Sequence, residues 1–132
     1  MNKKSILHLT LSKEPFNVMV TGEKKEEFRK NYEIILKRLT DETKANIYII
    51  NLPYLGSQNL ILPPYDYYFD TRTRKFNEII KKLSEDYKLK YIDLYMSHSK
   101  ISKEDFYSKD LFHPSDIGYK LWSEIIYAGF NK

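Results

Sequence analysis

The chain contains no cysteine, which excludes disulfide bonds and thiolate-ligated metal sites. It also lacks any apolar run long enough to span a membrane. A basic start, MNKK, precedes a short apolar segment at residues 5–11, but His8 and Thr10 interrupt that segment and no small-residue cleavage site follows. The sequence therefore predicts neither a signal peptide nor a membrane span, and we expect the protein as written to be cytoplasmic unless a longer form is exported.

Glycine is scarce as well, at 4 of 132 residues, and no glycine-rich loop or nucleic-acid-binding signature is present. The net charge is +4, but the lysines stand mostly among glutamates, as in GEKKEEFRK and EIIKKLSED. Such mixing is typical of solvated helix faces with ion pairs at i and i+4. We therefore expect no nucleic-acid partner, and a basic nucleic-acid binder is the weakest of the functional alternatives.

What is present suits a single folded domain over residues 1–132, because 42% of the residues are hydrophobic and 30% are charged. Short apolar, β-prone segments predict strands, and apolar residues at helical spacing predict amphipathic helices. The predicted strands cover residues 5–11, 46–52 and 90–95, and the predicted helices cover residues 23–40, 71–87 and about 115–129. The apolar stripe of the first helix consists of Phe28, Tyr32, Ile35, Leu36 and Leu39.

Alternating strands and helices predict an α/β fold with a parallel sheet and right-handed crossovers. The segment at residues 46–52 is apolar on both faces, as expected for a sheet covered by helices on both sides. In such folds ligands bind beyond the carboxyl ends of the strands. The chain leaves those ends at residues 12–22, 53–70 and 96–114, and the second segment is rich in proline and aromatic residues. Its aromatic side chains either wall an apolar substrate pocket or pin the loop to the core.

The stretch DLFHPSDIGYKLW at residues 110–122 contains the candidate site residues, Asp110 and His113. Pro114 biases His113 toward extended geometry just before a helix, for which Ser115 is the expected cap. Asp110 lies one loop turn earlier, so its carboxylate can reach the imidazole. A carboxylate on Nδ1–H fixes the tautomer, leaves Nε2 as a base and stabilises the imidazolium that forms on proton transfer.

A purely structural role for the same residues is the alternative: His113 packs or caps, and Asp110 is a turn residue. A metal site is not expected, because His8, His98 and His113 stand on separate predicted elements and no histidine pair has helical ligand spacing. No cofactor is expected.

The stretch at residues 110–122 resembles the terminal motif of the SGNH (GDSL-type) hydrolases, in which Asp-x-x-His-Pro, a short spacer and Gly-Tyr open the final helix. Residues 28–53, 74–95 and 106–122 are similar to successive blocks of that family. The resemblance implies a three-layer, flavodoxin-like SGNH fold that cleaves small-molecule acyl esters with a Ser-His-Asp triad. By that match Asp110 is the triad acid and His113 is the base.

The chain departs from the family pattern at the nucleophile. No Gly-Asp-Ser occurs, so the resemblance covers the C-terminal portion of the family and lacks its nucleophile strand and block. Where the family places an asparagine donor, the chain reads SKEPF, with Glu14 in place of the amide. Ser12 and Ser57 follow predicted strand ends and are weak candidates for the nucleophile, which therefore stays unknown.

Without the nucleophile strand, the segment at residues 5–11 is expected to be an exposed apolar edge. Such an edge predicts pairing with a missing N-terminal segment or with a second copy in a homodimer. Two functions remain open: an acyl-ester hydrolase that is incomplete in this chain, and a non-catalytic binding or assembly module that keeps the fold.

Overall fold

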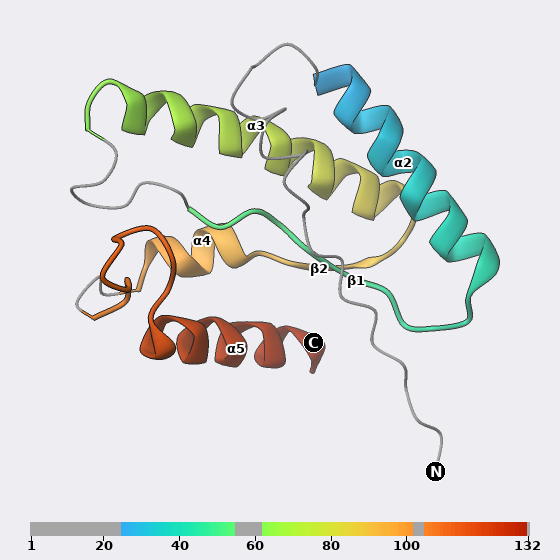
Figure 1. Ribbon diagram of the computed structural model, residues 1–132. Helices are drawn as coiled ribbons and strands as arrows, with labels where there is room; N and C mark the ends of the chain where they lie inside the picture. Colours follow the sequence, from blue (N-terminus) through green and yellow to red (C-terminus); the bar gives the residue numbers. More distant parts are fainter. Residues whose placement is uncertain (1–24, 55–61, 102–104, 132) are drawn as a thin grey trace.

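The computed structural model describes residues 25–54, 62–101 and 105–131. Helices α2 and α3 lie on one side of strands β1 and β2, and α5 lies on the other (Figure 1). The elements in chain order are α2 (Lys25–Glu42), β1 (Tyr48–Ile50), α3 (Tyr65–Asp86), β2 (Lys90–Ile92), α4 (Leu94–Ser99) and α5 (Asp116–Phe130). The strand predicted at residues 5–11 lies outside the described residues.

The two strands form a parallel sheet, which confirms the predicted α/β class. The register pairs Tyr48 with Lys90, Ile49 with Tyr91 and Ile50 with Ile92. Ile49 belongs to the core cluster beneath α2 and α3. On the opposite face Ile92 packs against α5, where a Cβ built on Gly129 would lie 2.7 Å from Ile92 Cγ1. Both faces are thus covered, although β1 is shorter than the predicted strand at residues 46–52.

Helix α2 buries most of its predicted apolar stripe. Phe28, Tyr32 and Leu36 are buried, and the ring of Phe28 meets that of Phe76 on α3 edge-on at 4.7 Å. Ile35 is 40% exposed, contrary to the prediction, because it lies at the margin of the stripe. The core beneath the two helices is therefore built from aromatic, leucine and isoleucine side chains, which recur at helical spacing along each helix.

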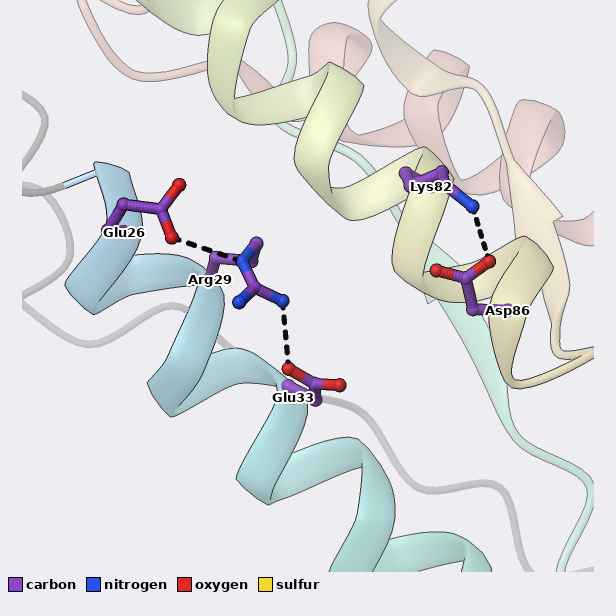
Figure 2. Close-up of polar contacts among 5 residues, drawn as sticks. All are labelled: Glu26, Arg29, Glu33, Lys82 and Asp86. Carbon is purple, nitrogen blue, oxygen red and sulfur yellow. Dashed lines mark hydrogen bonds and ion pairs between the residues drawn. The ribbon is translucent and has the colours of Figure 1, made fainter.

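Charged residues on the outer faces of α2 and α3 pair along each helix, as the mixed lysine and glutamate segments predicted. Figure 2 shows Arg29 between Glu26 and Glu33, at 3.3 and 3.0 Å, and Lys82 paired with Asp86 at 2.5 Å. These pairs are exposed, so each contributes little to stability.

Helix α3 begins at Tyr65, six residues earlier than the predicted start at residue 71. Pro64 occupies the N-cap position without a side-chain cap, and Asp66 lies in the first turn, where an acidic residue favours a helix start. The aromatic residues assigned by prediction to a loop at residues 53–70 are therefore partly helical. Tyr65 and Tyr67 are 65% and 76% exposed, so neither is packed into the core.

Helix α4 was not predicted, and the strand expected at residues 90–95 ends instead at Ile92. Asp93 caps α4, because its Oδ1 accepts a hydrogen bond from Met96 N at 3.0 Å. The helix buries Leu94, Tyr95 and His98. Within the described ranges, no helix is both long enough and apolar enough to cross a membrane.

Candidate active site

The loop that contains Asp110 and His113 is closed at its base by backbone hydrogen bonds. Tyr107 and Pro114 form an antiparallel bridge, and Ser108 N donates to His113 O at 2.8 Å. Immediately afterwards α5 begins, with Ser115 Oγ accepting from Gly118 N at 3.2 Å. The predicted cap at Ser115 is thus confirmed, and the loop is held against the first turn of a long helix.

Gly118 allows α5 to lie directly on the chain that leads into this loop. A Cβ at this position would stand 2.3 Å from the carbonyl oxygen of Phe106 and 2.9 Å from Pro114 Cβ. Real side chains do not approach a backbone oxygen so closely. The glycine of the sequence motif therefore has a structural reason, which is close contact between the helix and the base of the loop.

Asp110 and His113 form a direct contact, with His113 Nδ1 2.5 Å from Asp110 Oδ2. The other carboxylate oxygen, Oδ1, accepts hydrogen bonds from Ser108 Oγ, Phe112 N and His113 N at 2.6, 3.0 and 2.9 Å. The hydrogen bond from His113, followed by those from Ser108 and the two backbone N–H groups, holds the pKa of Asp110 well below its usual range. Asp110 is therefore ionised at neutral pH.

An ionised carboxylate only accepts, so the Nδ1 of His113 carries the proton in this contact. Nε2 is then the basic nitrogen, and it makes no hydrogen bond within the described part of the chain. The side chains of His113 and Asp110 are 64% and 50% exposed. The ring of Phe112 meets the imidazole edge-on at 5.0 Å. The imidazole is thus accessible and oriented, an arrangement that would suit proton transfer.

Leu111, between the two residues, has a φ of 59°, in the left-handed region that non-glycine residues rarely adopt. Its N–H donates to Ser108 O at 2.9 Å. This conformation turns the chain sharply enough for the next two N–H groups to reach the carboxylate of Asp110. Local backbone strain is thus placed inside the candidate site, where such strain is often found.

His98 lies behind the loop and is fully buried on α4. Trp122 Nε1 donates to His98 Nδ1 at 2.9 Å, and the ring of Phe106 packs edge-on at 4.6 Å. His98 is therefore a core residue. Among the described residues, no group of three His, Cys, Asp or Glu side chains is arranged to hold a metal ion. A pocket of about 30 Å³, room for about one water molecule, separates His98 and Trp122 from Phe112.

A larger open cleft of about 740 Å³ lies beyond the carboxyl ends of the two strands, at the predicted ligand edge of the sheet. Asn51 and Asp93, which follow β1 and β2, line it, and Asn51 Nδ2 donates to Asp93 Oδ1 at 2.9 Å. Tyr54 borders both the cleft and the small pocket next to Phe112. Tyr54, an aromatic residue of the predicted loop, therefore lies at the wall of both.

Comparison with known proteins decides the family. The family model for the GDSL-like Lipase/Acylhydrolase family matches residues 16–121. The chain belongs to this family. No curated protein sequence matches it.

Two solved structures share the fold. One, assigned as a GDSL-like lipase from Parabacteroides merdae, has a TM-score of 0.71 and 16% identity over 94% of this chain. The other, LAE5, an alpha/beta hydrolase enzyme from the metagenome of Lake Arreo in Spain, has a TM-score of 0.63 and 14% identity over 86% of this chain. The GDSL-like chain spans 59% of the first protein and 53% of the second.

The nucleophile candidates of this GDSL-like chain, Ser12 and Ser57, lie outside the described residues, as does Glu14. In residues 25–54, 62–101 and 105–131, no serine hydroxyl is bonded to His113. The hydroxyls of Ser108 and Ser115 donate instead to Asp110 Oδ1 and to Asp105 O. The structure thus brings together the predicted acid and base, and their catalytic roles stay a prediction.

Sequence reasoning missed Ser108. It stands two residues before Asp110, a spacing at which a serine hydroxyl can reach a following side chain in a turn. That local signal was available in the printed sequence, but only the folded loop shows which carboxylate oxygen the hydroxyl contacts.

Proposed function

We propose that this chain supplies the acid and base of an acyl-ester hydrolase site. His113 is the general base and Asp110 the residue that orients it. The observation that carries the proposal is that the two oxygens of the Asp110 carboxylate have different partners. Oδ1 accepts three hydrogen bonds from the loop, and Oδ2 is left facing His113 Nδ1 at 2.5 Å. A turn residue with no further role would not need an accessible imidazole on its second oxygen.

In the proposed reaction, Nε2 of His113 removes the proton from a serine hydroxyl as that oxygen attacks the ester carbonyl. The imidazolium that forms keeps Nδ1–H on the ionised carboxylate of Asp110, which stabilises its charge. The ring then gives the proton to the departing alcohol. A water molecule repeats the sequence and releases the acid. The substrate class is a small-molecule acyl ester, and no step needs a cofactor.

The nucleophilic serine is proposed to come from outside the described residues. Ser12 and Ser57 are the candidates in this chain, and an N-terminal segment or a second copy of the chain is the other source. The hydrogen-bond partners of Ser108 and Ser115 support this proposal, because both hydroxyls donate to acceptors other than His113. The family's oxyanion donors would have to come from the same source as the serine.

Labelling with a fluorophosphonate probe, read by peptide mass spectrometry, tests the proposal. We expect one serine to be labelled in the unmodified chain and not in His113→Ala. Ser123→Ala is the matched control, since its hydroxyl only contacts Lys120 O on the surface of α5. Equal labelling of the unmodified chain and His113→Ala would contradict the role of His113.

A folded chain that takes no label supports the second candidate, a non-catalytic binding or assembly module. The observation that favours this candidate is the sequence SKEPF at residues 12–16, where Glu14 replaces the family's asparagine donor and cannot donate a hydrogen bond when it is ionised. Such a module would pair through the apolar segment at residues 5–11. Light scattering at high micromolar concentration would then show a dimer, and a uniform monomer would argue against it.

A further inference from the structure

Ser108 is the residue at which the hydrogen bonds of the site loop converge. Its N–H donates to His113 O at 2.8 Å, and its carbonyl accepts from Leu111 N at 2.9 Å. Its hydroxyl donates to Asp110 Oδ1 at 2.6 Å. Ser108 therefore forms hydrogen bonds to His113, Leu111 and Asp110.

The hydroxyl of Ser108 contacts a side chain, the carboxylate of Asp110, whereas its two other hydrogen bonds join backbone groups. The backbone bonds set the path of the chain and would be made by any residue except proline. The hydroxyl is the only side-chain donor on Oδ1 among the described residues, and the remaining donors are the N–H groups of Phe112 and His113. With Oδ1 occupied in this way, rotation of the carboxylate would break three contacts.

We propose that Ser108 is a positioning residue for the Asp110–His113 pair. Its hydroxyl holds Asp110 Oδ1, so that Oδ2 faces His113 Nδ1 and Nε2 stays the basic nitrogen. This inference rests on the proposed function for its catalytic consequence, but its structural part does not. Misplacing a reacting group by about 1 Å can lower a rate by about a hundredfold, even when the substituted residue does not touch the reacting atoms.

Removing the hydroxyl has two expected consequences. The carboxylate of Asp110 loses a donor that stabilises its ionised form, so its pKa rises toward the ordinary value. The carboxylate also gains freedom to rotate, so the contact between Oδ2 and Nδ1 becomes less populated. The neutral imidazole then divides between its two tautomers, since the tautomer is set by the hydrogen bond at the other nitrogen.

The test is nitrogen-15 NMR of His113 in the unmodified chain and in Ser108→Ala, Ser108→Thr and Ser123→Ala. In the unmodified chain we expect the protonated nitrogen of the neutral ring to be Nδ1. In Ser108→Ala the Nδ1–H form should fall severalfold, and the titration midpoint of Asp110 should rise by about one pH unit, the effect of one charged hydrogen bond. Ser108→Thr, which keeps the hydroxyl, should restore both values, and Ser123→Ala should change neither.

An unchanged tautomer and an unchanged Asp110 titration in a folded Ser108→Ala protein would overturn the inference. Neither readout depends on a nucleophile. If the tautomer shifts while no variant is labelled by the fluorophosphonate, no serine of this chain is the nucleophile and the positioning role stands. If the unmodified chain is labelled through His113, the labelling rate of Ser108→Ala should fall about tenfold, and an undiminished rate would limit Ser108 to a structural role.

Discussion

The core beneath α2 and α3 and the loop at residues 108–113 are held together by different forces. In the core, Leu36 and Phe76 are 0% and 1% exposed and are held by apolar packing. In the loop, Asp110 and His113 are half exposed or more, and hydrogen bonds fix them. Packing determines whether the domain folds, whereas the loop bonds determine whether one carboxylate oxygen meets one imidazole nitrogen. Substitutions in the two regions should therefore separate stability from site geometry.

The largest expected effect is on the core. Phe76→Ala removes a ring that packs edge-on against Phe28 at 4.7 Å, and should lower the free energy of unfolding by about 3–5 kcal/mol. Urea denaturation followed by circular dichroism measures this value. Ile34→Ala is the matched control on α2, because Ile34 is 58% exposed and its loss should cost about 0.5 kcal/mol or less. If both variants lose the same stability, Phe76 is not a residue of the packed core.

The next effect falls where the two regions meet. Gly118→Ala would place a Cβ 2.3 Å from Phe106 O, so α5 must move away from the base of the loop. We expect a loss of about 1–3 kcal/mol in stability, together with changed NMR signals for His113. Gly129→Ala is the control on the same helix. Its Cβ would meet the buried side chain of Ile92 at 2.7 Å, at the end of α5 that lies away from the loop, so the His113 signals should stay in place. Equal changes in the His113 NMR signals of both variants would contradict the claim that Gly118 places α5 against the base of the loop.

The smallest effect on stability is expected from the loop, and it should depend on pH. The pKa of Asp110 is lowered in the folded protein, so its ionised form adds stability that is fully present above the unfolded pKa near 4 and is lost as pH falls through the folded pKa. Asp110→Asn should therefore be less stable than the unmodified chain at pH 7, and the difference should shrink below about pH 4. Thermal unfolding at pH 7 and pH 3 measures both values, with Glu124→Gln as an exposed control. A difference that is independent of pH would mean that the carboxylate charge contributes nothing to the loop.

Much of this comparison could be predicted from residue order alone. Apolar spacing identified the buried face of α2 through Phe28, Tyr32 and Leu36, and the cap at Ser115 placed the start of α5. The separation of Asp110 and His113 predicted that carboxylate and imidazole could meet, since a short loop before a proline leaves few other arrangements. These features are local, so neighbouring residues are enough to specify them.

Other features were missed because they depend on distant parts of the chain or on competing local signals. Asp93 ends β2 and caps α4, but the apolar residues after it also suit a strand. Helix α3 begins at Tyr65, directly after Pro64. This start was missed because the exposed tyrosines in the first turn form no apolar stripe. A short run of apolar residues does not by itself distinguish a buried strand from a buried helix segment.

Residue order was sufficient to predict the α/β class, the amphipathic faces and the contact between Asp110 and His113, because each depends on periodicity or on residues a few positions apart. Long-range contacts were needed to show that Gly118 lies against Phe106, that His98 is a core residue, and that Ser108 donates to Oδ1 while Oδ2 faces His113. The physical reason is that close contacts and hydrogen-bond directions follow from how the elements approach one another, which residue order alone does not specify.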